Sequence, residues 1–192
     1  NIQNWHTSYE DFEQNPYWIT NRIQTKEVRM HAIVSLSANL QVNDWLTVQA
    51  RANVDCIDDK VRQKFYASTA PALAGTNGRY LEMDYQDFQV YGDLMLMMKK
   101  KWGDFSVNGA LGGSITDKTT NSTRYDSKTA SLYYANVFTL ANIIMNGSAA
   151  LDQKIDSHRQ LQSLFATVQV GYKESAYIDL TARNDWSSTL SH

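Results

Sequence analysis

The sequence predicts an all-β chain: an antiparallel transmembrane β-barrel fragment of about six strands in three hairpins. Three observations predict it. Apolar and polar residues alternate along six segments, tight turns join these segments in pairs, and long connections separate the pairs. A run of about 18 apolar residues, which a membrane-spanning helix needs, is absent from the sequence. Barrel strands need no such run, because only one face of each strand contacts lipid.

The first hairpin is predicted from strands near 30–42 and 45–55. Along the first strand the even positions are apolar and the odd positions are polar, apart from Ile33. Asn43 and Asp44 follow, and such residues favour the tight turns of hairpins. The second strand then alternates in the same way, so its apolar residues also share one face.

The same unit is repeated twice along the chain. The four further strands are expected near 88–102, 105–115, 161–172 and 176–186. Gly103 and Asp104 make the turn between the first two, and a turn near Glu174 joins the last two. The whole chain, 1–192, is therefore expected to be one partial barrel domain.

The connections between the hairpins, roughly 57–87 and 116–160, are unusually long for a compact soluble domain. Short turns combined with long loops are typical of outer-membrane barrels, whose short turns face the periplasm and whose long loops face outside. Aromatic residues flank the short turns, where a girdle at the membrane interface is expected: Trp45, Trp102, Phe105 and Tyr172.

A soluble all-β module, for instance a glycan-binding domain, is the alternative interpretation of the same alternation. A soluble sandwich needs large apolar residues that interdigitate with a second sheet. Here the apolar faces also carry small residues, which suit contact with lipid better: Ala32, Ala38, Ala50, Ala52, Ala166 and Ala182. The pattern therefore favours the membrane barrel.

Composition excludes several classes of function. The 18 Lys and Arg residues against 20 Asp and Glu give a net charge of −2, which predicts no nucleic-acid partner. The single cysteine, Cys56, allows no disulfide within the chain and no cysteine-based metal site. The histidines at 6, 31, 158 and 192 show no metal-binding spacing, and no nucleophile or nucleotide motif is present. We expect no enzyme, no metal and no cofactor.

Four segments resemble the SusC/RagA family of TonB-dependent outer-membrane transporters of Bacteroidota. They are NPYW at 15–18, LQVNDWL at 40–46, DFSVNGALGG at 104–113, and the segment 171–190 with its RNDWSSTL ending. The resemblance follows the order of the chain but covers only the middle of the family's barrel. Because the chain also starts at Asn1 without Met, we expect a central barrel fragment in which the plug and the TonB box are absent.

The resemblance implies a function in nutrient uptake. The intact protein is expected to import glycans or oligosaccharides, or peptides, across the outer membrane of a Gram-negative bacterium. Its implied partners are a SusD-like surface lipoprotein that acts as a lid, the TonB complex acting through the missing N-terminal region, the solute and the lipid bilayer. The fragment would supply part of the barrel wall and two outer loops.

Five residues are candidates for contact with the solute. Arg183 and Asp185 lie at the polar positions of the last strand, where they would line the barrel interior. Tyr80, Tyr125 and Trp186 offer ring faces, on which sugars and peptides stack. The alternatives are that the polar pair makes ordinary hydrogen bonds inside the barrel and that the aromatic residues pack the loops together.

A basic run, Lys99 to Lys101, precedes the turn at Gly103. It could contact acidic lipid or a periplasmic partner. The alternative is a solvated rim in which the lysine stems lie along apolar surface and the ammonium groups reach water.

Overall fold

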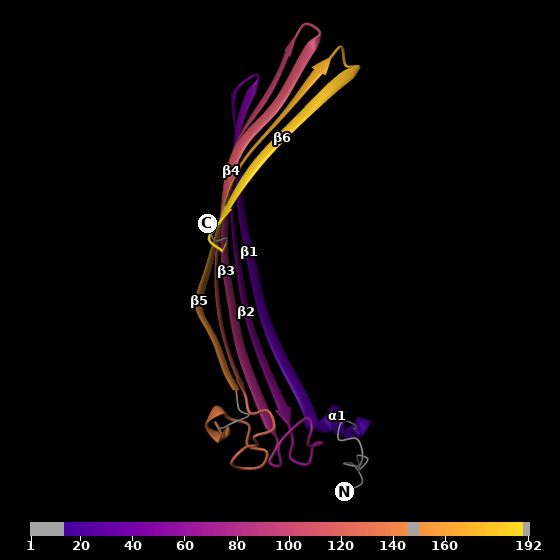
Figure 1. Cartoon of the computed structure of the whole chain (residues 1–192), viewed down its shortest axis with the longest axis vertical. Coiled ribbons are helices and arrows are strands. Elements are labelled where there is room, and N and C mark those ends of the chain that lie inside the picture. Colours follow the sequence, from indigo (N-terminus) through magenta and orange to yellow (C-terminus); the bar gives the residue numbers. More distant parts are fainter. Residues whose placement is uncertain (1–13, 146–149, 190–192) are drawn as a thin grey trace. The chain divides into compact units, whose positions relative to one another are not determined.

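The computed structural model describes residues 14–145 and 150–189. The six strands are β1 (Ile23–Asn43), β2 (Leu46–Phe65), β3 (Arg79–Trp102), β4 (Phe105–Asp126), β5 (Ala150–Tyr172) and β6 (Ala176–Ser187). They form one antiparallel sheet in the order β1-β2-β3-β4-β5-β6, so that each strand pairs with its neighbours in sequence (Figure 1). The prediction of an all-β fold with six antiparallel strands is confirmed.

Most strands are longer than the alternation predicted. β1 begins at Ile23, β4 continues to Asp126 and β5 begins at Ala150, so much of the expected long connections is strand. In these extensions both faces carry polar residues, as in Thr25-Lys26-Glu27, and the hydrophobic period disappears while the backbone pairing continues. The connections between hairpins shrink to residues 66–78 and 127–149.

Turn chemistry explains why the hairpins close where they do. The side-chain oxygen Oδ1 of Asn43 accepts hydrogen bonds from the backbone N–H groups of Trp45 and Leu46, at 3.1 and 2.9 Å. Gly103 has φ +54°, a left-handed conformation that glycine adopts without strain. Lys173 and Glu174 both have positive φ, as the central residues of a type I′ turn require.

The chain divides into two compact units. The loop unit contains Asn1–Met30, Ile57–Gln86 and Thr120–Asp156, and the hairpin unit contains His31–Cys56, Asp87–Thr119 and Ser157–His192. The three short turns lie in the hairpin unit, and the connections between hairpins lie in the loop unit.

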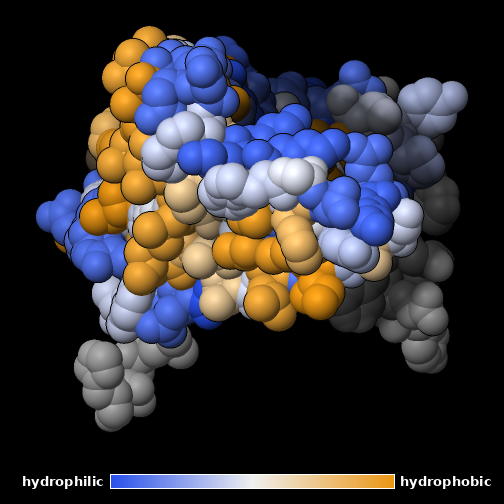
Figure 2. Space-filling model, turned by 90° about the horizontal axis from the view of Figure 1, so that it is seen from above, coloured by the Kyte–Doolittle hydropathy of each residue, from blue (hydrophilic) through white to orange (hydrophobic). Residues whose placement is uncertain are grey.

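The sheet has an apolar face and a polar face in the hairpin unit. The register of β5 and β6 places Ala166 opposite Ala182 and Val168 opposite Leu180 on the apolar face, with Gln169 opposite Asp179 on the polar face. Large apolar side chains remain exposed on every strand except β2, among them Leu36, Leu40, Leu94, Leu111, Leu164, Ile178 and Leu180. In Figure 2 the hydrophobic residues gather along one side of the sheet and the hydrophilic residues along the other.

The buried hydrophobic core lies in the loop unit. Tyr80, Leu132 and Ile143 form it, and Tyr125 and Phe138 pack against it. The second connection supplies three of these residues, and the ends of β3 and β4 supply Tyr80 and Tyr125. The first connection joins them through Tyr66, whose ring centroid lies 5.0 Å from that of Phe138. The loops are therefore folded together by apolar burial rather than extended separately into solvent.

A short helix, α1 (Pro16–Arg22), precedes β1 and belongs to the same unit. Asn15 caps it by accepting the N–H of Tyr17, and Pro16 occupies the first turn, where no intrahelical N–H is needed. The buried indole of Trp18 donates a hydrogen bond to Thr69 Oγ1 at 2.9 Å. The NPYW segment thus fastens the helix to the loop at 66–78.

None of the helices in the described part of the chain has the length and apolar character of a membrane-spanning helix.

Candidate functional site

The polar face of the hairpin unit is the candidate site, and it is built from paired side chains on neighbouring strands. Asn39 accepts from Gln49 at 2.8 Å between β1 and β2, and Asn108 donates to Gln169 at 3.2 Å between β4 and β5. Gln169 in turn donates to Asp179 on β6 at 2.8 Å. Because alternate residues of a strand share a face, the sequence period places all these side chains on the same side of the sheet.

Arg183 and Asp185, two of the predicted residues, form one cluster on this face. Arg183 Nε lies 2.9 and 3.0 Å from the two carboxylate oxygens of Asp185. The same guanidinium donates through Nη2 to Ser163 Oγ at 3.1 Å, across the β5–β6 pair. The Arg183 and Asp185 side chains both keep about half of their surface exposed. The cluster therefore offers a cation and an anion to a polar solute.

Arg51 and Asp93 make a second ion pair on the polar face, between β2 and β3. A hollow of about 300 Å³ lies beside it, lined in part by Ser35, Asn53 and Tyr91. Ser35 donates to Asn53 at 2.9 Å within this lining. The alternation along β2 places Arg51 on the polar face, but its partner on β3 could be found only from the way the two strands pair.

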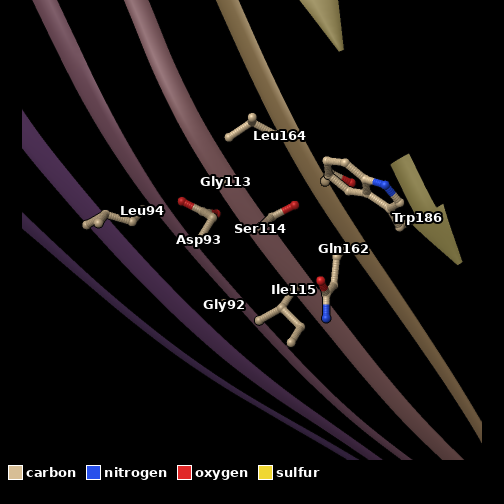
Figure 3. Close-up of a pocket in the computed structure, with 10 residues that line it drawn as sticks. Gly92, Asp93, Leu94, Gly113, Ser114, Ile115, Gln162, Leu164 and Trp186 are labelled. Carbon is tan, nitrogen blue, oxygen red and sulfur yellow. The ribbon is translucent and has the colours of Figure 1, made fainter. Parts of the chain in front are cut away.

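Trp186 lies on the opposite face from Arg183 and Asp185. The register pairs Trp186 with Gln162, and this pair shares the apolar face with Leu164. Figure 3 shows its indole reaching from β6 toward β5 at the side of a cavity of about 620 Å³. Gly92 and Gly113 belong to the lining, and because they have no side chains they leave space for the cavity. This cavity is open and mostly apolar, and one charged residue, Asp93, belongs to its lining.

Tyr80 lies in the loop core, where its side chain is almost fully buried, with 4% of its surface exposed. Its hydroxyl donates to Glu82 Oε2 at 2.7 Å. Burial and this hydrogen bond to a carboxylate raise the pKa of Tyr80 to about 12. The centroids of the Tyr80 and Phe138 rings lie 6.2 Å apart, so other residues of the protein surround the Tyr80 ring.

Tyr125 packs against the same core, partly buried. Both tyrosines belong to the loop unit, whereas the Arg183 cluster belongs to the hairpin unit. Their roles as solute contacts stay predictions.

The loop unit contains an ion pair that the sequence did not predict. Arg79 holds Asp126 with two hydrogen bonds of 2.8 Å, and Arg124 contacts the same carboxylate at 2.8 Å. Burial opposes ionisation of Asp126, but Arg79, the backbone N–H of Lys128 and Arg124 together hold its pKa below the ordinary value. Arg79 is the first residue of β3 and Asp126 the last residue of β4, so the pair joins the open end of this hairpin. No local sequence pattern indicates it.

The described residues show no metal centre. Within residues 14–145 and 150–189, no three side chains of His, Cys, Asp and Glu gather in a way that could hold a metal ion. His31 instead contacts Asp55 at 2.7 Å and His158 contacts Asp117 at 2.8 Å, each as a single pair. His6 and His192 lie outside the described residues.

No family model and no curated protein sequence matches the chain. Solved structures do match. The structure of the RagAB peptide transporter aligns with a TM-score of 0.74 and 18% identity, over 93% of this chain and 20% of that chain. The RagAB peptide importer in its 'open-open' state gives 0.72 and 20%, and in its 'closed-closed' state 0.71 and 18%. Each of these two matches covers 91% of this chain and 19% of the other.

This chain therefore spans about one fifth of the length of these transporter chains. At such identity the likeness shows a shared fold: the six-stranded sheet has the architecture of the matched part of each transporter chain. The likeness supports the resemblance to SusC/RagA proteins at the level of the fold. The matching proteins are named as transporters and importers, not as enzymes.

Proposed function

We propose that this chain forms part of the barrel wall of a TonB-dependent outer-membrane importer resembling SusC/RagA proteins, with glycans, oligosaccharides or peptides as its solutes. One observation carries the proposal: the hairpin unit is a sheet with one exposed apolar face and one polar face built from paired side chains. A barrel wall needs this arrangement, because lipid covers one face and the interior is polar.

The apolar face distinguishes this function from that of a soluble glycan-binding module. A soluble sandwich covers its apolar face with a second sheet about 10 Å away. The described residues form a single sheet, and Leu36, Ile178 and Leu180 are each at least 65% exposed. Lipid chains would cover such residues without any further protein.

The polar face supplies the proposed solute contacts. Arg183 presents a guanidinium and Asp185 a carboxylate, so together they match the two charged ends of a peptide or the hydroxyl groups of a sugar. Trp186 faces the other way and is proposed to contact lipid instead of solute. Tyr80 and Tyr125 are proposed to hold the two outer loops in shape.

The partners follow from the same proposal. A SusD-like lipoprotein would cover the loop unit, whose folded connections offer it a defined surface. The TonB complex would supply energy through a region outside this chain. The matched RagAB structures are named as a peptide transporter and a peptide importer, and this supports peptides as the first solute class to test.

Cell fractionation and uptake test this function together. The protein is expected in the outer-membrane fraction, and cells that carry it should take up labelled peptides or oligosaccharides. Substituting both charges of the cluster, Arg183→Gln with Asp185→Asn, is expected to lower uptake several-fold at equal protein level. Asn184→Ser, on the opposite face of the same strand, is the matched control. Recovery of the protein in the soluble fraction with glycan bound would contradict the proposal.

A further inference from the structure

The turn between β1 and β2 and the end of β3 create a basic site on an aromatic surface. We propose that Lys100, held between the indoles of Trp45 and Trp102, binds the phosphate group of an anionic phospholipid. We call these three residues the lysine–indole site. The inference rests on the proposed function, because a lipid leaflet must reach this part of the hairpin unit.

The ammonium group of Lys100 lies over both rings. Its Nζ is 5.5 Å from the ring centroid of Trp45 and 5.2 Å from that of Trp102. The backbone explains the arrangement: the N–H of Lys99 donates to the carbonyl oxygen of Trp45 at 2.8 Å, which brings the turn against β3. Trp102 is two residues beyond Lys100 and shares its face of the strand. Two indoles thus restrict a normally flexible side chain to one place.

Two lysines near Lys100 are paired with carboxylates, whereas Lys100 is not. Lys101 pairs with Glu174 at 2.8 Å, and Lys173 lies 3.7 Å from Asp104. Among residues 14–145 and 150–189, no carboxylate lies within ion-pair distance of Lys100. Its charge therefore faces only the two rings and solvent, and it remains available to an anion.

The hydrogen-bond donors of the site match a phospholipid headgroup. Lys100 offers three ammonium hydrogens, and each indole offers one N–H. In the described part of the chain neither indole N–H has a protein acceptor, and both tryptophans are partly exposed. A phosphodiester and its neighbouring ester carbonyls supply only acceptors, so the two sets are complementary.

The surface next to the site favours a lipid over a small soluble anion. Met98, on the same face of β3, and Phe105, across the β3–β4 turn, are exposed apolar side chains. The rings of Phe105 and Tyr172 pack with centroids 5.0 Å apart, which extends the aromatic surface. In a phospholipid the phosphate can contact the Lys100 ammonium group while the acyl chains contact the apolar surface. In a headgroup that has no amine, no internal cation balances the phosphate, so its negative charge is available to Lys100.

Tryptophan fluorescence tests the site with the protein reconstituted in phosphatidylcholine vesicles. A small, fixed fraction of lipid brominated on its acyl chains is added, either as phosphatidylglycerol or as phosphatidylcholine, since bromine quenches only indoles in contact with it. The quenching due to Trp45 and Trp102 is obtained by difference from the Trp45→Phe/Trp102→Phe variant. Brominated phosphatidylglycerol is expected to be enriched at the site about fivefold, the effect of one lysine near a membrane surface.

Two substitutions decide the outcome. Lys100→Gln should abolish the preference for phosphatidylglycerol, whereas Lys100→Arg should keep it. Lys101→Gln, the neighbouring lysine already paired with Glu174, is the matched control and should also keep it. Equal quenching by both lipids would overturn the lipid site while leaving the membrane barrel intact. Absence of quenching by either lipid would overturn the proposed function itself.

Discussion

Arg51 on β2 and Asp93 on β3 form an ion pair on the polar face, with Nε 2.9 Å from Oδ2, and no part of the Asp93 side chain is exposed to solvent. Arg51 also approaches the second oxygen, Oδ1, at 3.1 Å. A carboxylate so shielded needs a compensating partner, because burying an unpaired charge is costly. The pair therefore fixes how β2 and β3 meet at this point.

Removing the cation should destabilise the fold more than removing both charges. Arg51→Gln leaves the buried Asp93 with a weaker partner, and we expect a loss of about 1.5–3 kcal/mol, the value of a hydrogen bond to a charged group. The Arg51→Gln/Asp93→Asn double variant should recover part of it, because no buried charge remains. Urea unfolding of the reconstituted protein measures both changes. An equal loss in the two variants would contradict the role of the buried charge.

Gly112 provides a test of close packing on the polar face. A Cβ added there would lie 2.6 Å from Phe165 Cζ and 2.9 Å from Met95 Cγ, so neighbouring side chains must shift. We expect Gly112→Ala to cost about 1–3 kcal/mol by overpacking.

Gly92→Ala is the matched control, since the nearest atom to its added Cβ is 3.8 Å away. It should change the free energy of unfolding much less. Both variants are compared in the same urea titration, and an equal loss in both would show that the Phe165 contact is not tight.

Leu132 tests whether the connections between hairpins fold as one core. Its side chain is completely buried, so Leu132→Ala should cost about 2–5 kcal/mol by removing packed methyl groups and leaving a cavity. Hydrogen exchange is expected to accelerate at the amides of residues 127–143. Tyr134→Ser, at a side chain that is 74% exposed, should leave this exchange unchanged. Fast exchange already present in the unmodified protein would contradict a folded loop core.

Tyr80 makes the loop unit sensitive to alkaline pH. Its pKa is raised from 10.0 to about 12 by burial and by the hydrogen bond to Glu82, so the folded state holds the phenol proton more tightly than the unfolded state does. The resulting stabilisation is complete below about pH 10 and is lost as the pH rises through 12.

The ultraviolet absorbance of tyrosinate measures this effect as the difference between the protein and its Tyr80→Phe variant. The difference should have its midpoint near 12. Glu82→Gln removes the negative charge beside the phenol and should move the midpoint toward 10.0. A midpoint that Glu82→Gln leaves unchanged would rule out the contribution of this carboxylate.

The sequence predicted the sheet wherever one face is apolar. Alternation identified the strands of all three hairpins and placed Arg183 and Asp185 on one face, because the side-chain period of a strand is two residues. The same period puts Trp186 on the other face, beside Gln162. Where both faces become polar, as in Thr25-Lys26-Glu27, the pattern no longer marks a strand, and the first part of β1 could not be found.

The loop core could not be predicted for a different reason. The burial of Tyr80 depends on Leu132 and Ile143, which lie far along the chain, and no local pattern reports such a contact. The pairing of Arg79 with Asp126 depends on the same folding of the connections. The sequence therefore showed that Tyr80 is an aromatic residue near a loop, but it could not show that other residues bury its ring.

Spin labels at neighbouring positions of β1 test whether one face of the sheet meets lipid and the other a polar interior. Single cysteines replace Leu36 and Ser37 in a Cys56→Ser background, and the reconstituted protein is probed with oxygen, which concentrates in lipid, and with a water-soluble nickel complex. We expect high oxygen accessibility at position 36 and a strong preference for the nickel complex at position 37. Equal exposure of both positions to the nickel complex, with little oxygen effect at position 36, would contradict it.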